Sequence, residues 1–353
     1  MTTARDLALL RLVALRVAGP PPADAAEAVR LLTCVQGQDL PGALTSVALR
    51  TAQRTRAGVS AALDAGEVVR SWPMRSTLHL VPAEDLHWLL ELCGPRVLAG
   101  AARRRAVLGL TEADTERARE LVTAALSGGR RCSRKELLAV VADGGVATTG
   151  QRGYHLLWYL SQTGTLCLGP MDGGDQLFVL LDEWVAAPRR LDRDAALAEL
   201  ALRYLRGHGP ATVADLARWA GLPVTDVRAG VAAVRDELAA VEVDGREHLM
   251  APETADLLAG CRAQAAGLFL LPGFDEFVLG YADRSCAVPP EHADRIVPGG
   301  NGVFRPTVVH RGRVVGTWGW EGRGARRTVT ATPFTTFPDE VAEAIPAAAA
   351  ALP

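Results

Sequence analysis

The feature that most constrains the fold is an order of elements that occurs twice. Between residues 112 and 190 the apolar periodicity predicts three helices, then two short strands around a glycine turn. From residue 192 the order returns, with three helical segments and two strands around Asp244-Gly245. Three helices followed by a two-stranded hairpin is the plan of a winged helix.

The two ends of the chain complete this plan. The N-terminal part follows the same order more loosely, with helices predicted at about 4–17, 24–35, 41–54 and 57–65 ahead of two strands. After residue 266, Gly, Pro and β-branched residues replace the Ala-rich helices. We therefore predict a mainly α fold with β wings (α+β), with winged-helix units at 1–111, 112–190 and 191–265 and a C-terminal antiparallel β element with a short terminal helix at 266–353.

Cysteine, histidine and lysine usage excludes several kinds of site. The six cysteines occur singly and the seven histidines form no cluster with ligand spacing, so we expect no metal and no disulfide framework. Of 38 basic residues only Lys135 is a lysine, and no glycine-rich loop precedes it. A P-loop ATPase is therefore excluded, lysine-based covalent chemistry is not expected, and we predict no cofactor.

Hydropathy and charge restrict the cellular compartment and the binding partners that we expect. No apolar run approaches the ~18 residues that would span a membrane. Arg11 and Arg16 interrupt the N-terminal apolar stretch on a helical period, which favours an amphipathic helix over a signal peptide. We therefore expect a cytoplasmic protein. The net charge of −2 argues mildly against DNA binding.

The architecture argues in the other direction. Tandem winged helices favour DNA contact, because each can place a helix or a wing against a groove. Two classes of protein without catalytic activity stay open on this evidence. One is a non-catalytic DNA-binding regulator, which the lack of an evident ligand-sensing domain weakens, and the other is an interaction scaffold without DNA.

The stretch "CVQGQDL" holds Gln36 and Gln38 with only Gly37 between them. Residues two apart share one side of an extended segment, so the two amides can be aimed together. The alternative is a polar helix end, where a glycine is ordinary. Asp39 is an alternative carboxylate, but its adjacent position turns it away from the two glutamines if the segment is extended.

Four segments spread in order along the chain together resemble one family, the winged-helix DNA glycosylases of the AlkZ and YcaQ type. The segments are "CVQGQDLPGALTSVALRT", "SWPMRSTLHLVPAEDL", "FLLPGFDEFVLGYADRS" and "NGVFRPTVVHRGRVVGTW". The resemblance implies removal of bulky N7-alkylpurines from double-stranded DNA, with unhooking of interstrand crosslinks. It further implies either DNA repair or self-resistance to an alkylating antibiotic. We expect such a protein to be a monomer that associates with the nucleoid through DNA.

The family's catalytic signature is Gln, a hydrophobic residue, then Gln or Asp. It maps onto Gln36, Gly37 and Gln38, which the resemblance thus implies to be catalytic. Gly37 departs from the hydrophobic middle residue. Family hairpins also carry a glycine where this chain has Ser76.

Neutral amides suit this chemistry. An N7-alkylated purine already carries positive charge and leaves without needing a proton, so no strong base is required. The enzyme has to position a water and stabilise an oxocarbenium-like sugar, which amide oxygens can do through hydrogen bonds and dipoles.

Further polar residues are candidates for DNA contact or for lining the site. Arg75, Thr77 and His79 alternate along a predicted wing and are expected to share one strand face toward a DNA groove. Asp275 and Glu276, in "GFDEF", are expected either to line the site or to tie down a loop. Arginines suited to phosphate contacts are Arg284, Arg305, Arg323, Arg326 and Arg327.

Overall fold

The computed structural model describes residues 3–322 and 324–353. It divides into two compact units, a first unit of residues 1–59 and 197–353 and a second unit of residues 60–196. The chain passes from one unit to the other within helices α4 (Arg56–Asp64) and α10 (Arg193–His208). Among the described residues, no helix is both long and apolar enough to cross a membrane.

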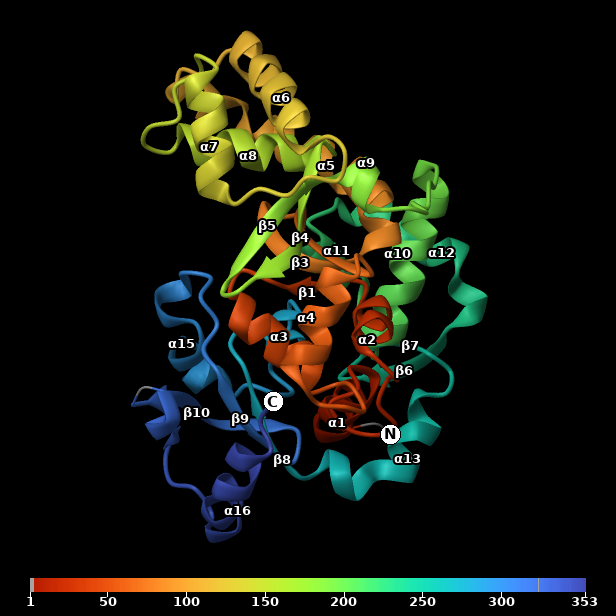
Figure 1. Cartoon of the computed structure of the whole chain (residues 1–353). Coiled ribbons are helices and arrows are strands. Elements are labelled where there is room, and N and C mark those ends of the chain that lie inside the picture. The colour runs from red at the N-terminus through yellow and green to blue at the C-terminus, as the bar shows by residue number, and fades with distance from the viewer. Residues whose placement is uncertain (1–2, 323) are drawn as a thin grey trace. The chain divides into compact units, whose positions relative to one another are not determined.

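The second unit is a group of helices on four antiparallel strands (Figure 1). These strands have the order β3-β2-β4-β5. Arg70 of β2 pairs with Leu168 of β4, so the two predicted wings of residues 1–190 join in one sheet. The elements are β2 (Val68–Met74), β3 (Thr77–Pro82), α5 (Leu86–Val107), α6 (Glu112–Leu126), α7 (Arg134–Asp143), α8 (Arg152–Gln162), β4 (Leu166–Asp172), β5 (Asp175–Leu180) and α9 (Leu181–Trp184).

Local signals account for the helix starts of this unit. The side chain of Ser133 accepts the backbone N–H of Glu136, whose carboxylate accepts the N–H of Ser133, a capping box that begins α7. Thr111 and Asp114 form the same motif at α6. The predicted cap at Ser133 is confirmed, and the apolar faces of these helices bury Trp72 and Phe178 in the core of the unit.

The first unit contains both ends of the described chain. Its N-terminal elements are α1 (Ala4–Ala14), α2 (Ala25–Leu32), β1 (Val35–Gln36) and α3 (Leu40–Ala48). Its later elements are α11 (Val213–Ala220), α12 (Val224–Ala233), β6 (Ala239–Val243), β7 (Arg246–Met250), α13 (Thr254–Ala265), β8 (Leu268–Leu271), α14 (Glu276–Leu279), α15 (Ala293–Ile296), β9 (Thr307–His310), β10 (Arg313–Glu321), β11 (Thr328–Pro333) and α16 (Asp339–Ala350).

The second run of three helices and a hairpin lies where it is predicted, in α10, α11, α12 and β6–β7. Gly221 ends α11 with φ of 71°, in the left-handed region that glycine adopts without strain. Asp244 and Gly245 form the hairpin turn with φ of 51° and 71°, as expected for a two-residue turn with both central residues at positive φ. The division of the chain into three winged-helix units stays a prediction.

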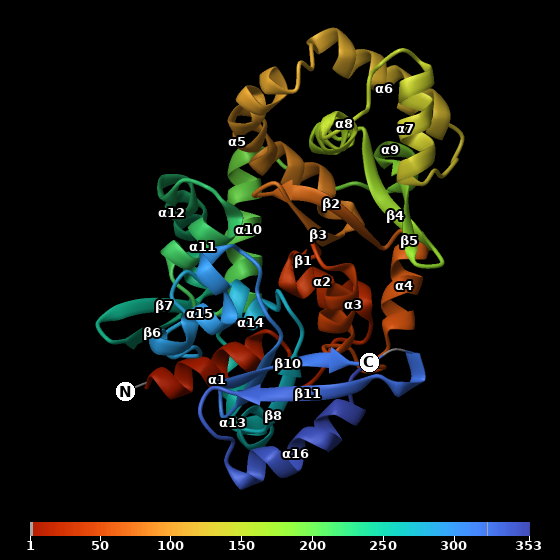
Figure 2. The same cartoon turned by 90° about the vertical axis from the view of Figure 1, so that its left-hand side faces the viewer.

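The C-terminal β element is larger than the predicted hairpin. Strands β9 and β10, with their tight turn at Arg311-Gly312, are found as predicted, but β8 and β11 extend them into a four-stranded antiparallel sheet of order β11-β10-β9-β8. Helix α16 packs on this sheet, and Val341 shares a core with Leu270 and Trp318 (Figure 2). Strand β9 starts only at Thr307, because Pro306 has no N–H to give a ladder.

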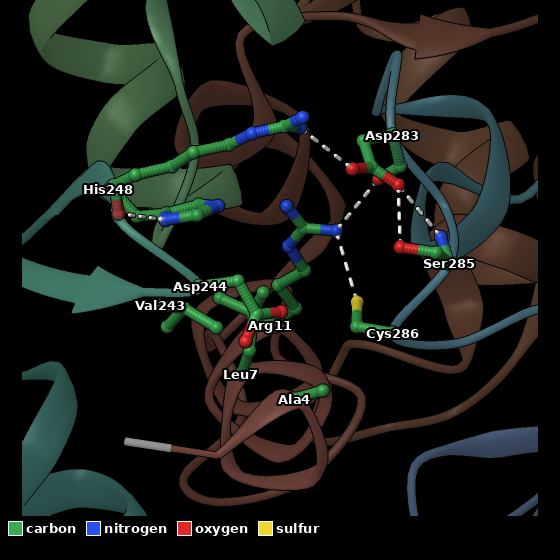
Figure 3. Close-up of a pocket in the computed structure, with 10 residues that line it drawn as sticks. Ala4, Leu7, Arg11, Val243, Asp244, His248, Asp283, Ser285 and Cys286 are labelled. Atoms are coloured by element: carbon green, nitrogen blue, oxygen red, sulfur yellow. Dashed lines mark hydrogen bonds and ion pairs between the residues drawn. The ribbon is translucent and has the colours of Figure 1, made fainter. Parts of the chain in front are cut away.

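Arg11 is a buried cation that ties the first unit together. Its guanidinium donates to the backbone oxygens of Pro210 and Asp283 and to Sγ of Cys286, lies over the ring of Tyr281, and is 3.6 Å from Oδ2 of Asp215. Figure 3 shows this group pointing between Asp283 and Cys286, at a cavity of about 190 Å³. The contacts satisfy the buried charge, so we interpret Arg11 as structural.

Candidate active site

The glutamine motif lies on a short strand between two helices. Helix α2 ends at Leu32, and the chain reverses at Thr33, whose φ of 67° and ψ of −55° close a three-residue turn. The N–H of Cys34 donates to the oxygen of Leu32 at 2.7 Å across this turn. A β-branched residue at positive φ is an outlier, and such backbone strain clusters at functional sites. Strand β1 follows at once.

The two glutamines differ in exposure. Gln36 ends β1 and is 5% exposed, whereas Gln38 is exposed in the bend that leads into α3. Only residues 35 and 36 are strand, so the extended segment that we predict is shorter than the motif. The helix end that would have been the alternative setting lies earlier, at Leu32.

Asp39 directly precedes α3 but does not cap it through its side chain. A Cβ at position 42 would lie 2.5 Å from Oδ2 of Asp39, so the carboxylate rests on the bare backbone of Gly42 in the first turn. The positive end of the helix dipole favours an anion there. This exposed carboxylate is therefore placed beside the motif, at the start of the following helix.

A fully buried carboxylate holds the backbone of the motif. The backbone N–H of Gln36 donates to Oε1 of Glu276 at 3.2 Å. The other oxygen, Oε2, accepts the indole N–H of Trp219 at 2.9 Å and lies 3.3 Å from Nε2 of His208. Three segments far apart in the sequence therefore meet at Glu276.

The neighbouring carboxylate, Asp275, holds helix α3. Its two oxygens accept hydrogen bonds from the Arg50 guanidinium, both at 2.9 Å, and Oδ2 also accepts the Ser46 hydroxyl at 2.7 Å. Burial raises the pKa of Asp275, but the charge and hydrogen bonds of Arg50 outweigh this effect and leave the pKa below its ordinary value. Asp275 thus has the loop-fixing role, which was one of its two predicted roles.

The turn that carries both carboxylates is tightly built. Phe274 has φ of 61°, in the left-handed region. A Cβ on Gly273 would lie 2.7 Å from the backbone oxygen of Phe304, so only glycine fits there. The turn is fixed on one side by the loop before β9 and on the other by α3 and β1.

Arg56 contacts helix α3, which follows the motif. Arg56 donates through Nε to the hydroxyl of Thr45 on α3 at 2.9 Å. Burial and the nearby charge of Arg327 lower its pKa, and the charge of Asp39 raises it. A cation beside this helix suits contact with an anion such as a phosphate. Sequence reasoning did not single out Arg56.

In the second unit, the predicted wing residues lie at the β2–β3 hairpin. Arg75 and Ser76 form its two-residue turn with φ of 54° and 57°. The expectation that Arg75, Thr77 and His79 share one strand face is wrong for Arg75, because it lies in the turn and not on a strand. A glycine at position 76 in family hairpins has a physical reason here, since the position requires positive φ.

His79 is buried and supports the hairpin. Its Nδ1 lies 2.9 Å from the oxygen of Thr77, and its Nε2 lies 3.1 Å from a guanidinium nitrogen of Arg75. A carbonyl accepts and a guanidinium donates, so the ring carries its proton on Nδ1. Burial, and then the charge of Arg75, lower the pKa of His79 to about 3. The structure therefore places His79 behind Arg75, and not on the surface.

The arginines predicted to contact phosphate lie on several loops of the first unit. Arg284 donates to the backbone oxygen of Val278 and lies 5.0 Å from the ring centre of Phe304. Arg305 and Arg326 are exposed. Arg323 lies outside the described residues. Within residues 3–322 and 324–353, no group of three or more His, Cys, Asp or Glu side chains is arranged to hold a metal ion.

An apolar cavity adjoins the turn that carries Asp275 and Glu276. It has a volume of about 520 Å³ and is lined by Val278 of α14, by Phe304, and by Arg284 and Arg218. This volume lies in the range of small-molecule sites, which are mostly apolar with a few polar groups.

The contact between Glu276 and Gln36 escaped sequence reasoning because 240 residues separate the two. One signal was present, namely the pair of acidic residues in "GFDEF" among apolar and aromatic neighbours, a context in which a carboxylate needs buried partners. Nothing in the sequence pairs Asp275 with Arg50, or Glu276 with Trp219 and His208.

Comparisons with known proteins identify the family of the chain. The family described as AlkZ-like DNA glycosylases matches residues 29–353. A relative from Streptomyces sahachiroi, named interstrand DNA cross-link repair glycosylase, is 31% identical over 308 residues, which cover 83% of this chain and 81% of the relative. The solved structure of Streptomyces sahachiroi DNA glycosylase AlkZ is similar with a TM-score of 0.81 at 27% identity, covering 99% of this chain and 95% of that chain.

These matches extend over nearly the whole chain, including the glutamine motif, and the structural match includes both compact units. They decide for an enzyme and against the non-catalytic regulator and the interaction scaffold. The chain belongs to the AlkZ-like DNA glycosylase family.

Proposed function

We propose that the protein hydrolyses the N-glycosidic bond of bulky N7-alkylpurines in double-stranded DNA, with Gln36 and Gln38 as its catalytic residues. The observation that carries the proposal is the setting of the motif. Its backbone is fixed by a buried carboxylate at Gln36, and it follows a strained turn at Thr33. Such rigid support is what a positioned catalytic group needs.

The proposed mechanism uses amide oxygens and no strong base. An N7-alkylpurine is cationic, so the bond to the sugar breaks with the base leaving neutral and the sugar taking up positive charge. A water held by the amide oxygens of Gln36 and Gln38 then adds to the sugar carbon and releases a proton to solvent, which leaves an abasic site. The dipoles of the same amides face the developing cation, which is stabilisation by preorganised groups.

The cavity beside α14 supports the proposal that the substrate carries a bulky adduct. Val278 and Phe304 provide an apolar surface that suits the hydrophobic part of a large adduct, and Arg284 provides a charge at the same place. The relative from Streptomyces sahachiroi is named for interstrand cross-link repair, and we extend our proposal to such crosslinks. The role that we propose for a protein of this specificity is DNA repair or self-resistance to a DNA-alkylating antibiotic.

The partner is double-stranded DNA, which we propose is held by arginines at its phosphates. Arg56, which donates to Thr45 on the helix after the motif, is one candidate, and Arg327, whose charge acts on Arg56, is another. Arg284, Arg305 and Arg326 are further candidates in the first unit. In the second unit, Arg75 and Thr77 are candidates at the β2–β3 hairpin, with His79 holding Arg75 from behind. We propose that the protein acts as a cytoplasmic monomer.

The test is base release from a duplex that carries a single N7-alkylguanine. Wild-type protein is expected to release the modified base and leave an abasic site, which alkali converts into a strand break. Gln36→Ala combined with Gln38→Ala is expected to lower the single-turnover rate by about 100-fold or more, a loss typical of removing a preorganised group.

Gln53→Ala is the matched control, because Gln53 is an exposed glutamine just beyond α3 and outside the motif. It should release base at the wild-type rate. Equal rates in the double variant and the wild type would show that the glutamines are not catalytic. Borohydride trapping should give no covalent adduct with DNA, since the only lysine, Lys135, starts a helix far along the chain from the motif.

A further inference from the structure

We propose that Glu276 is a positioning residue for this reaction, which fixes the backbone of Gln36 and is itself fixed by Trp219 and His208. The inference rests on the proposed function of Gln36. Glu276 does not act on the substrate in this account. Its carboxylate determines where the strand that carries the catalytic amide lies.

The burial of Glu276 is the first argument. The side chain is 0% exposed, and a buried carboxylate is strongly unfavourable unless hydrogen bonds compensate it. Its three nearest donors are the peptide N–H of Gln36, the indole N–H of Trp219 and Nε2 of His208. One of them is the backbone of the motif, so the compensation depends on the motif being in place.

The tautomer of His208 follows from its surroundings. Among the described residues, its buried Nδ1 has no hydrogen-bond partner, whereas Nε2 faces Oε2 of Glu276 at 3.3 Å. An unpaired buried N–H is rarer than an unpaired acceptor, so we place the proton on Nε2 and leave Nδ1 bare. His208 then donates to Glu276, and the carboxylate accepts three hydrogen bonds.

The ring of His208 is itself held firmly. The ring stacks on that of Tyr204 with 4.6 Å between ring centres. The hydroxyl of Tyr281 donates to the backbone oxygen of His208 at 2.8 Å. A Cβ at position 280 would lie 2.9 Å from Cδ2 of His208 and 3.4 Å from Oε2 of Glu276, so Gly280 leaves the room that this pairing needs. The support behind Glu276 is therefore rigid.

The link from Glu276 to the motif gives a defined functional expectation. The bond is to the peptide group of Gln36, so losing it shifts the strand without removing either catalytic amide. A displacement of about 1 Å at a catalytic group can lower a rate by ~100-fold. DNA binding, which we assign to arginines on other elements, should be unaffected. The rate of the chemical step should fall while affinity stays.

The experiment compares Glu276→Gln with wild type on duplex DNA bearing one N7-alkylguanine, with the enzyme in excess. Glutamine keeps the size of the side chain but replaces one acceptor oxygen with an NH2 group. In either orientation of the amide, this donor group faces another donor, the N–H of Gln36 or those of Trp219 and His208. We expect the single-turnover rate of base release to fall by about 10- to 100-fold, with the Kd for the same duplex within about 2-fold of wild type. Amide hydrogen exchange should be faster in a peptide that contains Gln36.

Asp215→Asn is the matched control. Asp215 is a carboxylate of the same unit, 1% exposed, which accepts the backbone N–H groups of Ala282 and Asp283 but has no contact of this kind with the motif. It should lose stability as Glu276→Gln does and keep the wild-type rate. Trp219→Phe, which keeps a ring and removes the indole N–H, gives a second and milder variant, with an expected loss of about 3-fold or more.

The outcomes are distinct. A wild-type rate in Glu276→Gln, or an equal loss of rate in Asp215→Asn, overturns the positioning role and leaves the proposed function standing. Should wild-type protein itself release no base, the proposed function fails, and the inference fails with it. Slow release by Glu276→Gln with unchanged Kd and a normal rate in Asp215→Asn supports it.

Discussion

Two adjacent carboxylates divide the support of the site between them. Asp275 pairs with Arg50, just beyond helix α3, and accepts the hydroxyl of Ser46 on α3, so it holds the helix that follows the motif. Glu276 accepts the N–H of Gln36 and holds strand β1 within the motif. Both side chains are buried, but one is compensated by a charge and the other by three hydrogen-bond donors. A single turn, reached through left-handed Phe274, thus fixes both flanks of the bend at Gln38.

Asp275→Ala tests the first of these supports. It leaves the guanidinium of Arg50, 1% exposed, without its charge partner, and breaking a buried pair on one side typically costs about 3–5 kcal/mol. We expect a loss of this size in the free energy of unfolding, measured by urea denaturation. Glu120→Ala, which breaks an exposed pair with Arg117, should cost less than about 1 kcal/mol. Similar losses in the two variants would contradict the assignment.

At the scale of elements, the hairpins show how much depends on their turns. The β2–β3 turn places Arg75 and Ser76 at positive φ, although neither is a glycine. The β6–β7 turn has the same form and uses Asp244-Gly245, a pair well suited to it. The first hairpin therefore carries a conformational cost that the second avoids.

Exchanging the turn residues should show this difference. Ser76→Gly is expected to raise the free energy of unfolding by about 0.5–1 kcal/mol, because glycine adopts positive φ without a Cβ clash. Gly245→Ala, the reciprocal change in the other hairpin, should lower it by a similar amount. Thermal unfolding of the two variants and of wild type measures both changes in the free energy of unfolding. A loss of stability in Ser76→Gly would show that the turn is not strained.

Sequence patterns predict these elements well where the signal is local. The caps at Ser133 and Gly221 and the turn at Asp244-Gly245 each depend on residues within a few positions of one another. Contacts over long separations escape such patterns, which is why Arg50 with Asp275 and Gln36 with Glu276 were not paired in advance. Gln36 and Gln38 were named as catalytic through family resemblance, because two amides alone resemble any polar loop.

At the scale of the whole molecule, histidines make the stability depend on pH. Burial and the charge of Arg75 lower the pKa of His79 to about 3. Burial, with Arg105 and Arg104, lowers that of His155 to about 4. In the unfolded chain both titrate near 6.5. Between these values the unfolded chain binds more protons than the folded one, so stability falls as pH falls from about 6.5 toward 4.

His79→Phe should reduce this dependence. Each such histidine contributes a slope of at most ~1.4 kcal/mol per pH unit, and phenylalanine removes one of them while keeping a ring in the buried position. We expect a flatter plot of unfolding free energy against pH between 4 and 6, measured in urea at several pH values. Parallel plots for the variant and wild type would mean that His79 is protonated in the folded protein as readily as in the unfolded chain.

The first unit is built from residues 1–59 and 197–353, and this has a consequence for synthesis on the ribosome. Gln36 is translated 240 residues before Glu276, the residue that holds its backbone. At ~5–20 residues per second, roughly 10–50 s pass between the two. The second unit, a continuous stretch of residues 60–196, can fold in that interval, whereas strand β1 is fixed only after Glu276 has been translated.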